Sequence, residues 1–340
     1  MTAPDAHLKH AREITRANGL VDLHLDSIIQ QRLFRYDVRK EHRAGVKGQP
    51  LFWHADLPRM GQAGYLGAAM GIHYFPKENA AAVREANRQI DYLDWVAETD
   101  PRAMRIRDAA DWETAANEGL IGMIPGVEGC HMLNGDIANL EAFCDRGIAY
   151  LTLTHFSKNS AATPSLGRGA NEEDTLTPFG HEVVDLLNAR GVVVDVAHAN
   201  QRCAIEAARR STAPVMATHS GAQGVHAHPR LLSDEAIDAV ADGGGVIGII
   251  FSPGFLTGSK KASSSCVVDH IDYIANRVGI DHVAIGSDYD GWVPAIPCDH
   301  RDCRDAVRVA AEMLRRGYDD TAVAKVWQRN ALRVFRTARR

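Results

Sequence analysis

The segment from Gly19 to Ser27 alternates apolar with polar residues, as in a half-buried β-strand, and its polar positions hold groups that bind metal ions. His24 and Asp26 are two residues apart, so their side chains share one face of the strand and can converge on one point. An imidazole nitrogen and a carboxylate oxygen held in this way make half of a divalent metal site. A His-x-Asp triplet alone also fits two solvated residues at a strand end, so this interpretation needs further ligands.

Two histidines elsewhere in the chain each end an apolar run. His198 follows the run 192–197, and His219 follows the run 214–218. If these runs are neighbouring strands of a barrel, the two imidazoles reach a single ion and form a second metal site. The alternative is a pair of hydrogen-bonded histidines in the core.

Glu128 ends the apolar run 121–128 and lies between Gly126 and Gly129, which allow close backbone approach and a tight exit from the strand. A carboxylate has two oxygens, so it can join two cations a few ångströms apart. Glu128 is therefore the natural bridge between the two pairs of ligands described above. It could instead cap the next helix or pair with an arginine.

The chain contains a repeating pattern of strands and helices. Eight apolar runs predict strands at about 19–26, 67–74, 121–128, 148–155, 191–198, 214–219, 245–251 and 282–288. After an opening helix, helical periodicity appears at 80–98, 139–146, 180–190, 200–210, 234–242, 267–278, 303–316 and about 320–336. Such alternation implies parallel strands joined by crossover helices. Eight units predict an α/β fold, a closed (β/α)8 TIM-like barrel; a doubly wound open sheet is the alternative.

Side chains that bind metals or ionise stand at or next to the last residues of these runs. They are His24, Asp26, Glu128, His155, His198, His219 and Asp288. The active site of a (β/α)8 barrel lies at the carboxyl ends of its strands, where these residues would meet. We therefore expect one domain, residues 1–340, folded as a barrel with a candidate metal site at this end.

Two segments are too long to be plain connections: 27–65, with many basic and aromatic residues, and 156–178, rich in Ser, Thr, Asn and Gly. Both follow strands on the side of the expected active site. Long loops in a compact domain are often functional, so we expect inserted active-site loops that shape the substrate cavity. Flexible insertions on the surface are the alternative.

Composition excludes several classes of protein. The 340 residues have a net charge of -5, with 45% hydrophobic and 24% charged residues, which is an ordinary globular composition. This balance lacks the excess of Lys and Arg that binding to nucleic acid or to an anionic membrane requires.

The polar first residues contain no apolar run typical of a signal peptide or membrane anchor, so we expect a cytoplasmic protein. Six cysteines without a CxxC pair predict free thiols; a zinc pair or a disulfide of Cys298 and Cys303 is the alternative.

Several motifs occur together in one order: DLHLD, GVEGCH, LTLTH, VVVDVAH, THSGA followed by HPR, and DHVAIGSDYDG. Their order and approximate spacing resemble those of the membrane dipeptidase (renal dipeptidase) family of binuclear zinc peptidases, which have an amidohydrolase-type barrel. The match covers about residues 19–335. The motifs are specific in combination, although each alone is weak.

The resemblance implies a ligand set for two zinc ions: His24 and Asp26 for one, His198 and His219 for the other, and Glu128 as the bridge. It further implies that His155 polarises the scissile carbonyl, that Arg230 binds the carboxylate of the substrate, and that Asp288 engages the substrate amine and moves protons. It also suggests a homodimer.

The residue types suit these roles. Water held between two zinc ions ionises near neutral pH and becomes a strong nucleophile, while the ions polarise the amide oxygen. Asp288 could take a proton from that nucleophile and hand it to the leaving amine. Arg230 offers a planar fork that matches a carboxylate, or it could simply be a solvated loop residue. The same ligands also admit manganese or cobalt.

The sequence departs from the family pattern at a few positions. The first motif has Leu25 where Asn is common, Ala197 stands where Ser is usual, and Leu231 and Leu232 follow Arg230 in place of the common Asn. Leu25 should point away from the metals by strand alternation. These departures leave the ligand set intact and put the substrate preference in doubt.

The leading hypothesis is a zinc-dependent dipeptidase whose substrates have free amino and carboxyl ends and can include a D-residue at the carboxyl-terminal position. A binuclear amidase or lactonase acting on N-acyl amino acids or related small molecules is one alternative, because one such site serves several hydrolyses. A catalytically silent barrel that only binds a small molecule is another.

Overall fold

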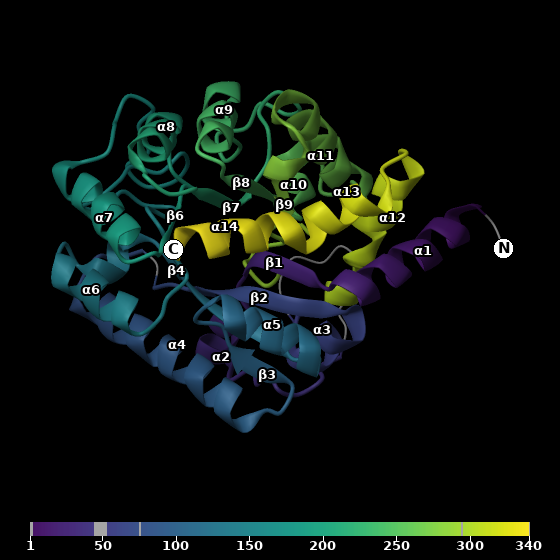
Figure 1. Ribbon diagram of the computed structural model, residues 1–340. Coiled ribbons are helices and arrows are strands. Elements are labelled where there is room, and N and C mark those ends of the chain that lie inside the picture. The colour runs from purple at the N-terminus through teal and green to yellow at the C-terminus, as the bar shows by residue number, and fades with distance from the viewer. Residues whose placement is uncertain (1–2, 44–52, 75, 294, 340) are drawn as a thin grey trace.

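Within residues 3–43, 53–74, 76–293 and 295–339, which the computed structural model describes, eight parallel strands form a closed barrel (Figure 1). They are β1 (Leu20–Leu25), β2 (Tyr65–Ile72), β4 (Ile121–Glu128), β5 (Tyr150–Thr152), β6 (Val193–Asp195), β7 (Met216–Ser220), β8 (Val246–Ile249) and β9 (Val283–Ile285). Each pairs with the next in this order, and β9 pairs with β1 to close the ring. The predicted (β/α)8 barrel is confirmed, and the open sheet is wrong.

A short additional strand, β3 (Ala103–Arg105), was not predicted from the sequence. It pairs with residues 121–123 at the start of β4, whereas β5 pairs with residues 126–128 at its end. Since β2 pairs along the other edge of β4, β3 lies below β5 on one edge and outside the closed ring. Three residues are too few to show a periodic pattern.

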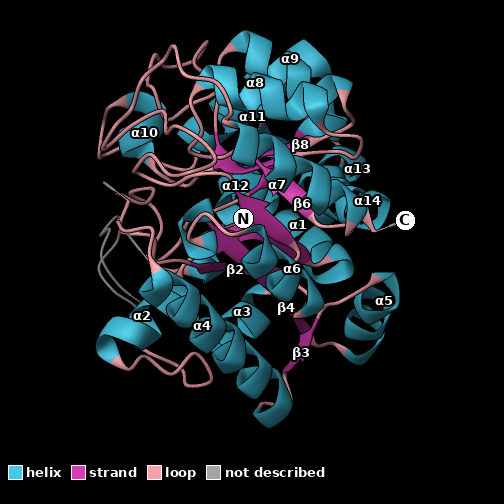
Figure 2. Cartoon of the chain, turned by 90° about the vertical axis from the view of Figure 1, so that its left-hand side faces the viewer, coloured by secondary structure: helices cyan, strands magenta, loops and turns pink. Residues whose placement is uncertain are grey.

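Helices surround the barrel and connect its strands (Figure 2). They are α1 (Ala3–Asn18), α2 (Ser27–Phe34), α3 (Leu57–Ala63), α4 (Ala80–Thr99), α5 (Ala109–Glu118), α6 (Ile137–Asp145), α7 (Pro178–Ala189), α8 (Gln201–Arg210), α9 (Asp234–Asp242), α10 (Pro253–Thr257), α11 (Ser265–Val278), α12 (Val307–Arg315), α13 (Asp320–Ala324) and α14 (Asn330–Ala338). The predicted helix near 320–336 is divided, because a π-helical turn over Lys325–Arg329 separates α13 from α14. That turn buries Trp327 completely.

Local sequence determines where several helices begin. The side chain of Ser233 accepts a hydrogen bond from the backbone N–H of Ala236 at the start of α9. Asp108 and Asp111 form a capping box at the start of α5, a helix that was not among those predicted.

Helix α14 covers one end of the barrel (Figure 1). Its Leu332 and Phe335 belong to one buried apolar cluster with residues that point into the barrel, such as Val21, Val193 and Val246. These strand residues lie near the amino ends of β1, β6 and β8. Apolar side chains therefore fill the amino end of the barrel, and the polar side chains gather at the carboxyl end.

The two long segments have different structures. The segment 27–65 contains α2 and α3, while its residues 44–52 lie outside the described residues. The segment 156–177 has no helix or strand in its described residues. Isolated β-bridges, such as the one between Ser157 and Arg168, connect residues within it.

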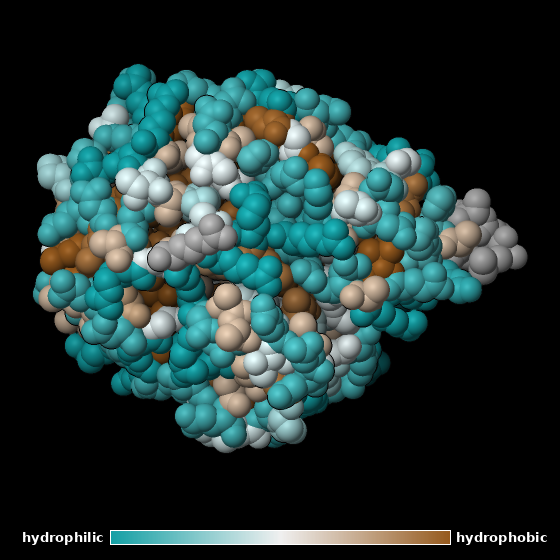
Figure 3. All heavy atoms as spheres, viewed as in Figure 1, coloured by the Kyte–Doolittle hydropathy of each residue, from teal (hydrophilic) through white to brown (hydrophobic). Residues whose placement is uncertain are grey.

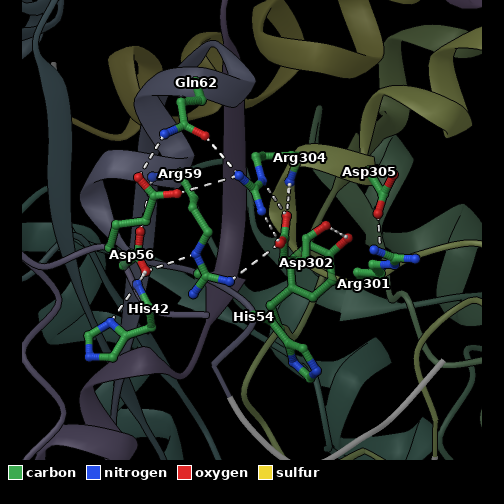
Figure 4. A network of polar contacts seen from close by, with 12 residues as sticks. His42, His54, Asp56, Arg59, Gln62, Arg301, Asp302, Arg304 and Asp305 are labelled. Carbon is green, nitrogen blue, oxygen red and sulfur yellow. Dashed lines mark hydrogen bonds and ion pairs between the residues drawn. The ribbon is translucent and has the colours of Figure 1, made fainter. Parts of the chain in front are cut away.

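A buried ionic network fixes the segment before α3 against the segment after β9 (Figure 4). The guanidinium group of Arg59, which is fully buried, donates to Asp56 over 2.8 Å and to Asp302 over 3.4 Å. It also donates to the hydroxyl oxygen of Tyr36. Arg304, on the outer side, donates to the same Asp302 carboxylate. The network connects two loops that both adjoin the carboxyl end of the barrel.

The face in Figure 3 is mainly hydrophilic, with small separate hydrophobic patches. Among the residues that the structure describes, no helix combines the length and apolar character needed to cross a bilayer. The six cysteines are free; Cys298 is exposed and Cys303 is buried.

Candidate functional site

The first predicted ligand pair lies at the carboxyl end of β1. Nε2 of His24 is 3.4 Å from Oδ1 of Asp26, and both residues are buried. Gly71 on the neighbouring β2 provides the space for them. A Cβ atom at Gly71 would lie 2.0 Å from Oδ1 of Asp26 and 2.9 Å from Cε1 of His24. Only glycine at this position leaves the two ligands where they are.

Glu128, at the end of β4, lies between the two predicted ligand pairs. Its Oε1 atom is 3.1 Å from Nε2 of His198 and 3.5 Å from Nε2 of both His24 and His219. The carboxylate is buried and contacts ligands from both pairs. This is the position expected of a bridging ligand, although the bridging role itself stays a prediction.

The second predicted pair comes from the segment just after β6, where His198 lies three residues beyond Asp195, and from β7, which contains His219. The Nε2 atoms of His198 and His219 are 2.9 Å apart, and His198 has a φ of 65°, in the left-handed region. This conformation is uncommon for a residue with a side chain and lowers the stability of the fold locally. It places the imidazole of His198 against that of His219.

A hydrogen-bond chain sets the tautomer of His219. The hydroxyl of Thr218 donates to Oδ2 of Asp195 over 2.8 Å and lies 2.9 Å from Nδ1 of His219. Since the hydroxyl has one proton and donates it to Asp195, it accepts from Nδ1–H of His219. Nε2 of His219 then keeps its lone pair, as a metal ligand requires. Asp195 is fully buried and also accepts from the hydroxyl of Thr152.

Tyr150, on β5, orients the imidazole of His24. The hydroxyl of Tyr150 lies 2.7 Å from Nδ1 of His24, opposite the nitrogen that faces the carboxylates. A Cβ atom at Gly126 would lie 2.0 Å from Cζ of Tyr150. Gly126 was expected to allow close backbone approach, and the group that approaches it is this aromatic ring.

The three residues predicted to handle the substrate surround the ligands. Nε2 of His155 is 3.7 Å from Oε1 of Glu128. Asp288 has a φ of 56°, and its backbone N–H donates to the carbonyl oxygen of His24. Arg230 is buried, yet none of its three guanidinium nitrogens has a hydrogen-bond partner among the described residues. A buried guanidinium without partners costs free energy, and a bound anion would supply the missing hydrogen-bond acceptors.

Burial and close charges perturb the acids and bases of the site. Burial and the Asp26 carboxylate raise the pKa of Asp288 to about 7, against the attraction of His24 and Arg230. Burial lowers the pKa of His24, but Glu128 and Asp26 outweigh it, and the pKa rises to about 10. Perturbed values of this kind concentrate at functional sites.

The two histidines of the second pair respond in the opposite sense. Burial, together with neighbouring positive charge, lowers the pKa of His198 and His219 well below the ordinary value. Their imidazoles are neutral and have lone pairs available for a cation.

The donor atoms fit a metal site. Nε2 of His24, Oδ1 of Asp26 and Oε2 of Glu128 are buried without a hydrogen-bond partner among the described residues. Ligand atoms lie within 4.8 Å of one another in three groups: His24, Asp26 and Glu128; His24, His219 and Asp288; and Glu128, His155 and His198. Unpaired buried atoms cost about 1–3 kcal/mol each, and a divalent cation would satisfy all of them at once.

Sequence reasoning missed several residues of this site. His73, at the carboxyl end of β2, is buried, and its Nδ1 atom lies 3.9 Å from Oε2 of Glu128. The signal that identified the predicted ligands, a polar residue that ends an apolar run, was present at His73 as well. Tyr150, Asp195 and Thr218 had no comparable signal, because their roles depend on contacts between strands.

Comparisons with known proteins agree with the fold. The model of the membrane dipeptidase family, peptidase family M19, matches residues 8–340. A protein named dipeptidase tcpJ from Claviceps purpurea is 32% identical over 295 residues, which cover 83% of this chain and 69% of that protein.

Two solved structures share the fold. The structure described as dipeptidase AC, a metallopeptidase of family M19, has 25% identity and a TM-score of 0.84, and the alignment covers 95% of this chain and 99% of the other. A metallopeptidase from Rhodobacter sphaeroides, solved with a phosphinate mimic of the dipeptide L-Ala-D-Ala, has 23% identity and a TM-score of 0.83 over 94% and 99% of the two chains. The family match places this chain among metallo-dipeptidases, hydrolases that act on peptide bonds. The chain belongs to the membrane dipeptidase family, peptidase family M19.

Proposed function

We propose that this protein is a dipeptidase that uses two zinc ions, with His24 and Asp26 holding one, His198 and His219 the other, and Glu128 bridging them. The observation that supports it most is the contact of one buried carboxylate, Glu128, with imidazoles of both pairs. Zinc in such a site supplies Lewis acidity toward a carbonyl oxygen and lowers the pKa of water to near neutrality.

Arg230 recognises the free carboxylate of the substrate in this proposal. Its guanidinium group is buried and lacks hydrogen-bond partners among the described residues, so a carboxylate that docks there gains charge-assisted bonds without displacing an existing partner. Burial lowers the pKa of Arg230 to about 10, which leaves it positively charged at neutral pH.

Asp288 engages the amino end of the substrate and moves protons. With a pKa of about 7, its carboxyl group can both accept and release a proton near neutral pH. Nε2 of His155 lies 3.7 Å from Oε1 of Glu128, and in this proposal its imidazole polarises the scissile carbonyl group. A positive anchor and a negative anchor near the reacting bond favour a short substrate with both ends free.

The proposal extends to dipeptides with a D-residue at the carboxyl-terminal position. Its support is the R. sphaeroides metallopeptidase, whose bound phosphinate mimics L-Ala-D-Ala. L-Ala-D-Ala is therefore the natural probe beside L-Ala-L-Ala.

The test combines zinc content with a panel of dipeptides, their N-acetylated and carboxyl-amidated forms, and N-acyl amino acids. We expect two zinc ions per chain and turnover only of dipeptides with free ends. A zinc-loaded protein that hydrolyses none of the dipeptides would overturn the proposal, and preference for N-acyl amino acids would favour the amidase.

Arg230→Ala distinguishes the same alternatives through one residue. We expect kcat/KM for dipeptides to fall on the order of 100-fold, because a buried charged contact is lost, while zinc content stays at the wild-type value. Equal efficiency in wild type and variant would argue for a substrate without that carboxylate.

A further inference from the structure

His73 belongs to the same inner face of the barrel as the predicted ligands. It lies one residue beyond the end of β2, two residues after Gly71, whose missing side chain makes room for His24 and Asp26. Because residues two apart in a strand share a face, His73 stands directly above that space.

The backbone of His73 is held on both sides by one buried side chain. The amide of Gln89, on α4, accepts from the N–H of His73 over 3.2 Å and donates to its carbonyl oxygen over 3.0 Å. Arg32, on α2, donates to the same carbonyl oxygen over 3.1 Å. These three hydrogen bonds fix the backbone of His73 and therefore the direction of its Cα–Cβ bond.

The imidazole of His73 lies closest to a different oxygen of Glu128 from the one that the predicted histidine ligands approach. His24, His198 and His219 approach Oε1 of Glu128 to 3.5 Å or less, whereas Nδ1 of His73 lies 3.9 Å from Oε2. Both Oε2 and Nδ1 are buried and have no hydrogen-bond partner among the described residues.

The distance of 3.9 Å between Nδ1 of His73 and Oε2 of Glu128 is too long for a hydrogen bond. It does fit two ligands of one cation, because bonds of about 2.0–2.2 Å to zinc place neighbouring donors roughly 3 to 4 Å apart. An ion between the two atoms would satisfy both.

We propose that His73 is an additional protein ligand, through Nδ1, of the ion held by His24, Asp26 and Oε2 of Glu128. This inference rests on the proposed two-ion function and assigns a sixth protein ligand to it. The imidazole adds a neutral donor, so it strengthens binding of that ion without changing the charge of the site.

The experiment measures metal affinity in the whole chain, independently of turnover. Metal-free wild type, His73→Phe and His73→Asn are titrated with Zn²⁺ against a chromophoric chelator, and with Co²⁺ while its visible absorption is recorded. His73→Phe keeps a ring of similar size without a donor, and His73→Asn keeps a polar atom near the position of Nδ1 as a second variant that disturbs packing in a different way.

His131→Gln is the matched control. His131 is another buried imidazole near the site, but its ring nitrogens face Ser157 and Asn159 and not Glu128. It should lose local hydrogen bonds and keep both ions at wild-type affinity.

In His73→Phe we expect one of the two ions to bind about 10–100-fold more weakly, with an altered Co²⁺ spectrum and the other ion unaffected. His73→Asn should fall between this variant and the wild type. Wild-type affinities and spectra in both variants would overturn the inference. A wild type that binds no zinc would overturn the proposed function as well, whereas a two-zinc wild type with unaffected variants would overturn the role of His73 alone.

Discussion

The hydroxyl of Tyr150 lies 2.7 Å from Nδ1 of His24 and so fixes the ring whose other nitrogen faces Asp26 and Glu128. Partners behind a ligating histidine set its orientation and raise its affinity for the metal. Tyr150→Phe removes only the hydroxyl, so we expect zinc to bind about 10–100-fold more weakly at one site while the fold is kept.

Chelator competition measures this loss, and Tyr65→Phe is its control. Tyr65 is also buried, at the start of β2, and its hydroxyl has no hydrogen-bond partner among the described residues. If both variants bind zinc as the wild type does, Tyr150 does not position His24.

Gly71→Ala tests the space beneath the first ligand pair. The added Cβ would lie 2.0 Å from Oδ1 of Asp26, so the carboxylate must move and we expect loss of about one zinc ion per chain. Gly61→Ala, on α3, is the matched change: its Cβ would meet its nearest atom at 4.0 Å. Alanine in a helix is favoured over glycine by about 1 kcal/mol, so that variant should be slightly more stable. Full zinc content in Gly71→Ala, measured by atomic absorption, would contradict the geometry.

Arg59→Met tests the buried network of Figure 4. The substitution leaves Asp56 and Asp302 buried without their shared cation, and we expect the free energy of unfolding to fall by about 3–5 kcal/mol. Urea unfolding measures this loss. Arg304→Met removes a cation from the same Asp302, but its side chain is 38% exposed, so the loss should be smaller. Equal losses in the two variants would show that burial of Arg59 is not the cause.

His270 predicts a dependence of stability on pH. Its Nδ1 accepts from the N–H of Ala222 and its Nε2 lies 3.0 Å from the carbonyl oxygen of Leu256, and burial lowers its pKa to about 4. Between pH 4 and about 6.5 the unfolded chain binds a proton at this histidine that the folded chain does not bind, so stability falls as the pH falls through this window.

Urea unfolding in the presence of a chelator, at several pH values from 4.5 to 7, measures this contribution. His270→Gln should flatten the slope of the free energy of unfolding against pH relative to wild type. An unchanged slope would mean that His270 is protonated in the folded protein.

Much of the architecture could be predicted because local pattern determines it. The eight barrel strands follow from short apolar runs, and the predicted ligands follow from the polar residues that end them. The sequence did not predict α2 and α3, which lie in a segment expected to be a loop, or α5, in which only Trp112 and Ala115 are buried and too few apolar positions show a period. The strand β3 was missed because three residues show no period.

The site was predictable only in part, for a different reason. A ligand at a strand end is visible in the sequence, but the groups behind it come from other strands: Tyr150 on β5 supports His24 on β1, and Asp195 on β6 supports His219 on β7 through Thr218. The first pair joins residues 126 positions apart, and the second depends on the pairing of the neighbouring strands β6 and β7. His73 had the same signal as the predicted ligands and was overlooked because no recognised motif includes it.

The most direct test of the two-ion site is an anomalous-difference map at the zinc absorption edge, from crystals of the full chain grown with zinc. We predict two peaks, one beside His24 and Asp26 and one beside His198 and His219, each about 2.0–2.2 Å from its donor atoms, with Glu128 touching both. A single peak, or peaks at which Glu128 is not a ligand, would contradict the account.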